Sequence, residues 1–195
     1  ASSGNVEAQI NNSGDIQVRV DAFPSGSEFS LTESASARGA GISVGNTPAA
    51  GGLFAILIPI ESSESVGPDS MISEVTNSSL SSIDVVVNAS GTNADATAAG
   101  IEQQSFSTKE THLDANNSGS INVTANASAS GGFLLADADA DGYGIRKNDS
   151  GQGNEGDDAR LQITNSGEVN VTASARASST TAYADARAFG LQQTA

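Results

Sequence analysis

The residues with the clearest chemical potential are three carboxylates spaced two positions apart, Asp137, Asp139 and Asp141, followed directly by Gly142. An EF-hand calcium loop has oxygen ligands at its first, third and fifth positions and a glycine at its sixth, so this segment matches the first half of such a loop. The second half does not match, because the twelfth position needs a bidentate Glu and the chain has Asn148 there. The flanking residues alternate as in strands, so we do not expect an EF-hand.

A weaker calcium site on the surface is compatible with the same residues. Carboxylates at alternate positions of a strand share its outer face, where an acidic surface can collect divalent cations. A second acidic group follows in the next expected loop. The candidate calcium ligands are Asp137, Asp139, Asp141, Glu155, Asp157 and Asp158. We expect no other cofactor.

Catalysis is not expected. His112 is the only histidine, so a histidine metal site or a Ser-His-Asp triad would have to include it. Leu113 and Ala115 fit inward-facing positions, which places His112 on the outer face of a strand. The acidic residues that could hydrolyse a polysaccharide occupy ordinary outward positions of a repeated pattern, without a basic or aromatic platform. We therefore predict that the protein is not an enzyme.

The composition narrows the possible partners. The chain has 195 residues and a formal net charge of −15, which disfavours binding to nucleic acid or to an anionic membrane surface. It has no Cys, which excludes disulfides and thiolate metal sites, and no apolar run long enough to insert into a membrane. With no Trp, two Tyr and six Phe, the core must be narrow and built from small side chains. Disorder would also fit this composition, but strict alternation argues against it.

A two-part phrase that recurs four times supplies the elements that position these residues. Its first part is a turn followed by alternating apolar residues, as in Asn117-Ser118-Gly119 followed by Ile121 and Val123. The turn is Asn-Ser-Gly in three copies and the looser Asn77-Ser78-Ser79 in the other. Its second part is an Ala-x-Ala-x-Ala run that closes on Gly-Ile or Gly-Leu. The second part occupies residues 35–42, 94–101, 136–145 and 182–191.

A third short strand precedes each Asn-Ser turn, over residues 6–10, 71–75, 111–115 and 159–163. Three strands per repeat, stacked repeat on repeat, predict one all-β domain over residues 1–195, a parallel β-solenoid of about four three-stranded rungs. Stacked rungs bring equivalent residues about 4.8 Å apart, so we expect Ile/Val columns, Ala columns and a ladder of Asn amides facing inward or outward. A β-sandwich would also alternate, but would not repeat the same three strands in the same order.

A long insertion loop over residues 46–69 interrupts the first repeat. It contains the most hydrophobic stretch of the chain, residues 51–60. This stretch is compatible with a buried hairpin or cap on the flank of the solenoid. It is also compatible with an exposed apolar patch that meets a neighbouring subunit through Leu53, Phe54 and Ile56.

The two ends of the chain match each other. Residues 190–195 followed by residues 1–14 closely reproduce the internal junction at residues 100–119. Neither end has a capping helix or a Pro-rich stop, so we expect unpaired strand edges at both ends. We expect the N-terminal strand, residues 5–11, to complete the last rung of a neighbouring subunit. The expected interface residues are Val6, Ala8 and Ile10 at one end and Ala184, Ala186, Ala188 and Leu191 at the other.

The phrase Asn-Ser-Gly-x-Ile-x-Val-x-Ala-x-Ala, followed by Ala-x-Ala-x-Ala-x-Gly-Ile, resembles the repeats of autotransporter passenger domains and related secreted bacterial β-helix adhesins. The resemblance covers about residues 11–193, apart from the loop over residues 53–69. It implies a right-handed parallel β-helix, secretion and a cell-surface or extracellular role, and it carries over no catalytic residue. The opening Ala1-Ser2-Ser3-Gly4 has a form that removal of a signal peptide would leave.

These features together predict an extracellular structural protein that assembles head to tail with itself into a filament, sheath or matrix. The alternative is an adhesin or carbohydrate-binding fragment of a longer secreted protein. That protein would bind surface glycans through exposed loops at residues 46–69 and 146–158.

Overall fold

The computed structural model describes residues 5–23, 34–45, 56–59, 70–105, 110–149 and 158–194 of the chain. All regular elements assigned in these ranges are β-strands, and none of the described residues forms a helix that could cross a membrane. Every pairing between these strands is parallel. The prediction of an all-β protein with parallel sheets is therefore confirmed.

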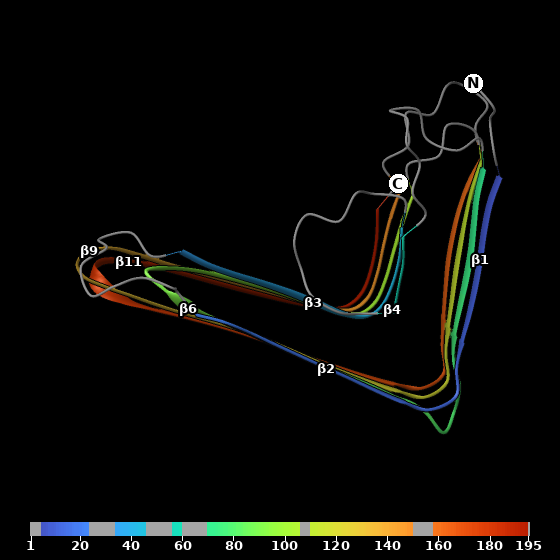
Figure 1. The fold of residues 1–195 in the computed structure, drawn as a ribbon, viewed down its shortest axis with the longest axis horizontal. Coiled ribbons are helices and arrows are strands. Elements are labelled where there is room, and N and C mark those ends of the chain that lie inside the picture. The colour runs from blue at the N-terminus through green and yellow to red at the C-terminus, as the bar shows by residue number, and fades with distance from the viewer. Residues whose placement is uncertain are drawn as a thin grey trace.

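The strands that precede the Asn-Ser turns form one four-stranded sheet. Its strands are β1 (Asn5–Asn12), β5 (Ser70–Asn77), β8 (Glu110–Asn117) and β10 (Asp158–Asn165), paired in that order. Figure 1 shows them nested along one side of the molecule. The positions of these strands are as predicted, because alternation marked them clearly in each repeat.

The two parts of the repeated phrase form a second sheet with a sharp bend. Its strands are β2 (Asp15–Ala22), β3 (Ser34–Gly45), β4 (Ile56–Pro59), β6 (Ser82–Gly91), β7 (Asn93–Ser105), β9 (Ser120–Asp149) and β11 (Glu168–Thr194). In the third and fourth repeats both parts of the phrase belong to one long strand, where we expected two. The bend between them is absorbed by register shifts at Ser178/Ser179 and Ser179/Thr181 instead of a chain break.

Two segments expected as loops contain strand. Residues 146–149 belong to β9, and residues 56–59 of the insertion form β4, which pairs with β3. Below, repeats 1 to 4 denote residues 5–45, 70–105, 110–149 and 158–194. Apart from β4, each strand pairs with its equivalent in the neighbouring repeat, as the overlaid strands of Figure 1 show.

The core lies between the two parts of the phrase and is built from small and branched side chains. Ile83, Val85 and Val87 of β6 are at most 1% exposed, and the inward alanines of β7 are also buried. The glycines of the Gly-Ile closure explain the narrow spacing. A Cβ atom on Gly100 would lie 2.3 Å from the Cγ2 atom of Ile121, and one on Gly144 would lie 2.3 Å from the Cγ1 atom of Val169. The second part of one repeat therefore packs on the first part of the next repeat.

A ladder of asparagine amides marks the corner between the two sheets. Asn12 donates to Asn77 at 2.8 Å, Asn77 to Asn117 at 2.8 Å, and Asn117 to Asn165 at 2.7 Å. Asn77 and Asn117 are at most 1% exposed. The sequence pattern allowed this ladder to face either way, and the structure places its middle members inside. Because a buried amide needs partners, the ladder fixes the register of neighbouring repeats.

Candidate assembly surfaces

Two strand edges lie open at the ends of the stack of repeats. Among the described strands, β1 pairs only with β5 and β2 only with β6, and we call the outer sides of β1, β2 and β3 the N-terminal edge. At the other end β10 pairs only with β8 and β11 only with β9, and their outer sides form the C-terminal edge. The outward peptide groups of such an edge can accept another parallel strand.

Side-chain exposure rises sharply at the C-terminal edge. Ile101 and Ile145 are 0% exposed, whereas Leu191, at the equivalent position of repeat 4, is 50% exposed. The predicted interface residues in the same strand are also exposed, although the residues at equivalent positions of repeats 2 and 3 are buried. These exposed residues are Ala184, Ala186 and Ala188. The structure thus places the predicted C-terminal group on an open surface.

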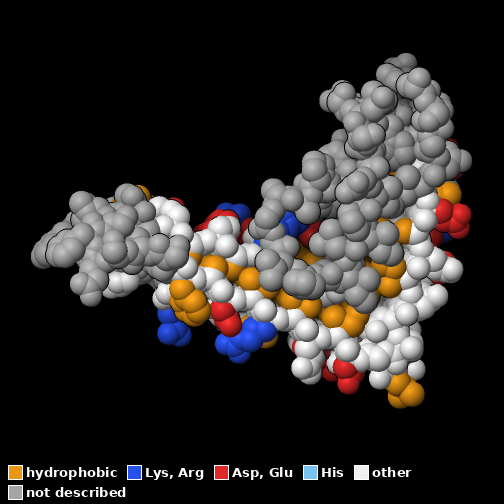
Figure 2. Space-filling view, viewed as in Figure 1, with side chains coloured by type: hydrophobic (Ala, Val, Ile, Leu, Met, Phe, Trp, Pro, Cys, Tyr) orange, Lys and Arg blue, Asp and Glu red, His pale blue; other side chains and the backbone are white. Residues whose placement is uncertain are grey.

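The N-terminal edge is less exposed. Ala8 is 8% exposed and belongs to the core, and Ile10 packs against it as a partly buried residue. Val6 pairs with Met71 through the backbone, and its side chain lies outside the described part of the chain. In the view along the stack, many hydrophobic side chains lie in a band across the face that is not drawn in grey, with most charged side chains on either side of it (Figure 2).

Two glycines at the ends of the stack face space that no described residue fills. A Cβ atom on Gly190 would meet nothing within 4 Å, whereas one on the equivalent Gly144 would collide with Val169 and with the carbonyl oxygen of Gly190. Gly14 also has nothing within 4 Å, whereas a Cβ atom on the equivalent Gly167 would lie 2.0 Å from the carbonyl oxygen of Gly119. At Gly144 the following repeat fills the space beside the glycine, and at Gly167 the preceding repeat fills it, so neither position has room for a Cβ atom. At the ends the same space is open to another rung.

A polar side chain at a fixed position links neighbouring repeats. Gln103, three residues after its closing glycine, donates to the carbonyl oxygens of Ser73 at 3.2 Å and Asp114 at 3.1 Å. These acceptors lie in β5 and β8, so one amide bridges two repeats. Lys147, at the equivalent position, donates to the carbonyl oxygens of Leu113 and Gln162 in β8 and β10.

Gln193 is the corresponding residue of repeat 4, and its bridge is half complete. Its side-chain amide donates to the carbonyl oxygen of Leu161 at 3.0 Å. Among the described residues it has no second carbonyl, because no strand follows β10 in the stack. The sequence analysis missed this column. Its signal was the recurrence of a long polar residue three positions after the closing glycine in repeats 2, 3 and 4.

The N-terminal edge carries a partial cap formed by the insertion, for which a hairpin or cap on the flank of the solenoid was one of two interpretations. Strand β4 pairs with the outer side of β3, with Ile42 opposite Ile56 and Gly45 opposite Pro59. The expectation of an uncapped N-terminal end was therefore wrong over residues 42–45. For residues 56–59 the pairing favours the interpretation of the insertion as a cap. Leu53 and Phe54 lie outside the described residues.

The candidate ligand Asp139 lies in a column of aspartates that runs along the stack. Asp95, Asp139 and Asp185 occupy equivalent positions of β7, β9 and β11. The pKa values of Asp95 and Asp139 are raised, first by burial and then by the neighbouring carboxylate of Asp141. Close carboxylates would favour a cation, but Asp185 already pairs with Arg187.

The described residues include no group of three His, Asp or Glu side chains arranged to hold a metal ion. Asp137 and Asp158 are exposed, while Glu155 and Asp157 lie outside the described residues. Calcium binding on this face stays a prediction. His112 lies 3.3 Å from Glu110 with its side chain one-third exposed.

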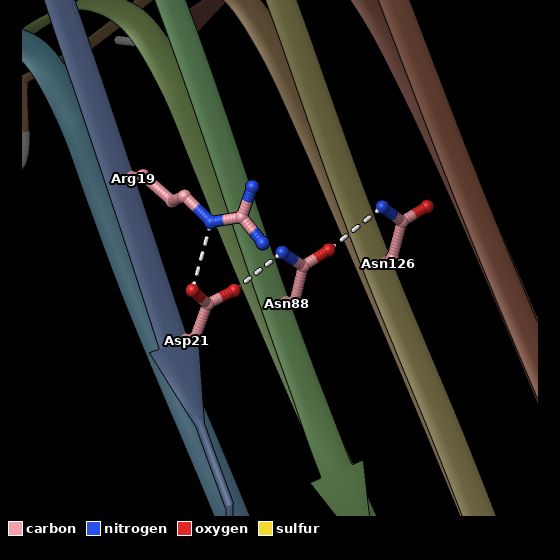
Figure 3. Close-up of polar contacts among 4 residues, drawn as sticks. All are labelled: Arg19, Asp21, Asn88 and Asn126. Atoms are coloured by element: carbon pink, nitrogen blue, oxygen red, sulfur yellow. Dashed lines mark hydrogen bonds and ion pairs between the residues drawn. The ribbon is translucent and has the colours of Figure 1, made fainter.

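A second polar row runs along the outer face of the first part of the phrase (Figure 3). Asn126 donates to Asn88 at 2.9 Å, and Asn88 donates to Asp21 at 2.6 Å. Arg19 also binds Asp21, and its hydrogen bond, followed by that of Asn88, lowers the pKa of Asp21. The row therefore ends at the N-terminal edge in an ionised acceptor.

Comparisons with protein-family models, with curated proteins and with solved structures found no match to this chain.

Proposed function

We propose that this chain is an extracellular structural protein, a right-handed parallel β-solenoid that extends head to tail by pairing its C-terminal edge with the N-terminal edge of a second molecule. The observation that carries the proposal is the contrast between Gly144 and Gly190. The repeat requires a glycine where the next rung packs, and at Gly190 the glycine is present while no described residue fills the space beside it. Secretion and the extracellular location are supported by the resemblance of the repeats to those of autotransporter passengers.

We call the contact between the two edges the joint. The pairing between internal repeats indicates which residues would lie opposite each other there. Because β10 would pair with β1 in the register that relates β8 to β10, Gln162 would lie opposite Gln9 of the second molecule. The amide of Gln193 would then reach the carbonyl oxygen of Gln9, as Gln103 reaches that of Asp114. Gly190 would pack on Ile16, as Gly100 packs on Ile121.

Burial at the joint supplies the free energy of association. Fully burying a Leu side chain contributes about 1.5–3 kcal/mol, so covering the exposed half of Leu191 contributes about 1 kcal/mol. Several partly buried residues on each edge would add to this. They are Ile16, Val18 and Val20 at the N-terminal edge and Leu161, Ile163, Val169 and Val171 at the C-terminal edge. Ordered strand pairing gives the contact its direction, and a head-to-tail contact that does not close produces a filament.

Charges at the joint are mixed. Arg160 would lie opposite Glu7 of the second molecule, which is attractive, and Glu168 would lie opposite Asp15, which is repulsive. Exposed pairs contribute little. We therefore assign the joint's stability to packing and backbone pairing.

The test is negative-stain electron microscopy and sedimentation velocity of the 195-residue chain beside Gly190→Val, each with and without EDTA. The substitution fills open space in the single molecule, so the variant should fold normally while losing filaments that the unaltered chain forms. Loss of filaments in EDTA would show that the acidic rows bridge molecules through calcium. Single particles of the unaltered chain under all conditions would contradict the proposal and favour the glycan-binding alternative, which a glycan array would then test.

A further inference from the structure

We infer that the outer side of β3 at residues 42–45 is the docking place for residues 191–194 of a second molecule, and that β4 occupies this place until it is displaced. The inference rests on the proposed head-to-tail function and adds a competing strand to it. Its occupant is therefore a second copy of this chain, and its competitor is a segment of the same molecule.

The strand register identifies the competition. Ile101 pairs with Ile42 on one side and Ile145 on the other, and Ile145 pairs with Ile101 and Leu191. Continuing this column past Ile42 brings Leu191 of the preceding molecule into the next position. Ile56 of β4 stands there. A complete joint and an intact β3–β4 pairing cannot coexist at these residues.

Strand β4 is a short occupant of the site. It pairs over four residues only, and it ends at Pro59, which has no backbone N–H to donate. The competing segment is the end of β11, a strand of 27 residues that would pair along β2 and β3 together. It also brings Gln193, whose amide gains its second carbonyl partner, that of Gln9 in β1, only when this segment is docked on β3.

Displacement has a kinetic consequence. Because β4 is tethered to β3, its effective local concentration is high, and a second molecule must compete with it at each joint. The preceding molecule can pair with β1 and β2 first, since no described strand covers the outer sides of these two strands. Assembly should therefore be slow at the step in which residues 191–194 replace β4.

A disulfide lock tests the inference directly, since the chain has no cysteine of its own. Ser43 and Leu57 are register partners of β3 and β4, so the double variant Ser43→Cys/Leu57→Cys would tie β4 in place when oxidised. The matched control is Ser90→Cys/Ser128→Cys, which ties β6 to β9 away from both edges. Assembly is followed by light scattering, and folding by circular dichroism and size-exclusion chromatography.

We expect the oxidised β3–β4 lock to slow assembly at least tenfold, and reductant to restore the rate of the unaltered chain. The oxidised control should assemble normally. A second variant, with residues 56–59 replaced by Gly-Ser-Gly-Ser, should assemble several-fold faster. Assembly of the locked form at the unaltered rate, or loss of assembly on replacing β4, would overturn this inference while the head-to-tail function stood. If the unaltered chain and the replaced variant both stay monomeric, the proposed function itself fails.

Discussion

The interior repeats and the terminal repeats share one sequence pattern but have different surroundings. In repeats 2 and 3 each closing glycine is in contact with the next repeat, each bridging side chain has two carbonyl partners, and the inward residues are almost fully buried. Repeat 4 keeps the glycine and the glutamine, but Gly190 has open space and Gln193 has one carbonyl. The repeat pattern therefore specifies contacts to a following rung even where the described residues contain no such rung.

The largest expected difference between interior and terminal repeats is the effect of a glycine substitution on the free energy of unfolding. Gly144→Ala places a methyl group 2.3 Å from Val169 and 2.4 Å from the carbonyl oxygen of Gly190, so it should lower the free energy of unfolding. We expect a loss of about 3 kcal/mol, typical of overpacking against a backbone atom. Gly190→Ala should change stability by less than about 0.5 kcal/mol, as for surface sites. Urea unfolding of both variants measures the contrast, and equal losses would show that the spacing argument is wrong.

Among the bridging residues Gln103, Lys147 and Gln193, only Lys147 should make the stability of the protein depend on pH. Burial, opposed by the carboxylate of Asp114, lowers the pKa of Lys147 from 10.5 to about 7. Between these values the unfolded chain holds a proton on Lys147 that the folded chain releases, so stability rises as pH increases from 7 toward 10.5. Lys147→Gln copies the residue found at positions 103 and 193, removes this dependence and should stabilise the protein by about 2 kcal/mol near pH 7.

Thermal or urea unfolding of both proteins between about pH 7 and pH 10 measures this prediction. The difference between them removes the contribution of other titrating groups. A difference that does not shrink as pH rises would mean that Lys147 is not held in its neutral form.

The positions of the strands were predictable, because alternation and the Asn-Ser turns recur at each repeat. The Gly-Ile closure was also visible, although its reason, contact with the next repeat at Ile121 and Val169, required the structure. A hairpin or cap at the insertion was one of two interpretations, but the pairing of β4 with β3 was not predictable, since backbone contacts leave no repeat in the sequence. Lys147 fell within the loop expected over residues 146–158, and its burial was not predictable, since a lysine rarely occupies a buried strand position.

In the asparagine ladder we expect a smaller difference in the free energy of unfolding between an interior and a terminal position. Asn117 accepts from Asn77 and donates to Asn165 within the stack, whereas Asn12 at the end donates to Asn77 and accepts from the backbone N–H of Gly14. Asn117→Ala should lower the free energy of unfolding by about 2 kcal/mol, because it leaves buried amides unpaired. Asn12→Ala should cost about half as much. Urea unfolding checks the order, and a larger loss at Asn12 would contradict it.

The smallest effect is expected from surface charge at the joint. Arg160→Glu would place an acidic side chain opposite Glu7 of the neighbouring molecule in the proposed register, so assembly should weaken by about two- to fivefold. Glu168→Gln removes the repulsion with Asp15 and should strengthen assembly by a similar factor. Sedimentation equilibrium at low and high salt measures both. Unchanged association in both variants would mean that these strands are not opposed.

The most direct test of the central claim is an intermolecular disulfide across the proposed joint. Asp21 and Ser174 occupy equivalent positions of β2 and β11, so Asp21→Cys in one molecule and Ser174→Cys in another should lie side by side. We predict that oxidising a mixture of the two single variants gives the mixed dimer in high yield, and that Asp21→Cys mixed with the out-of-register Asn170→Cys does not. Equal cross-linking of both mixtures, or of neither, would contradict head-to-tail rung completion.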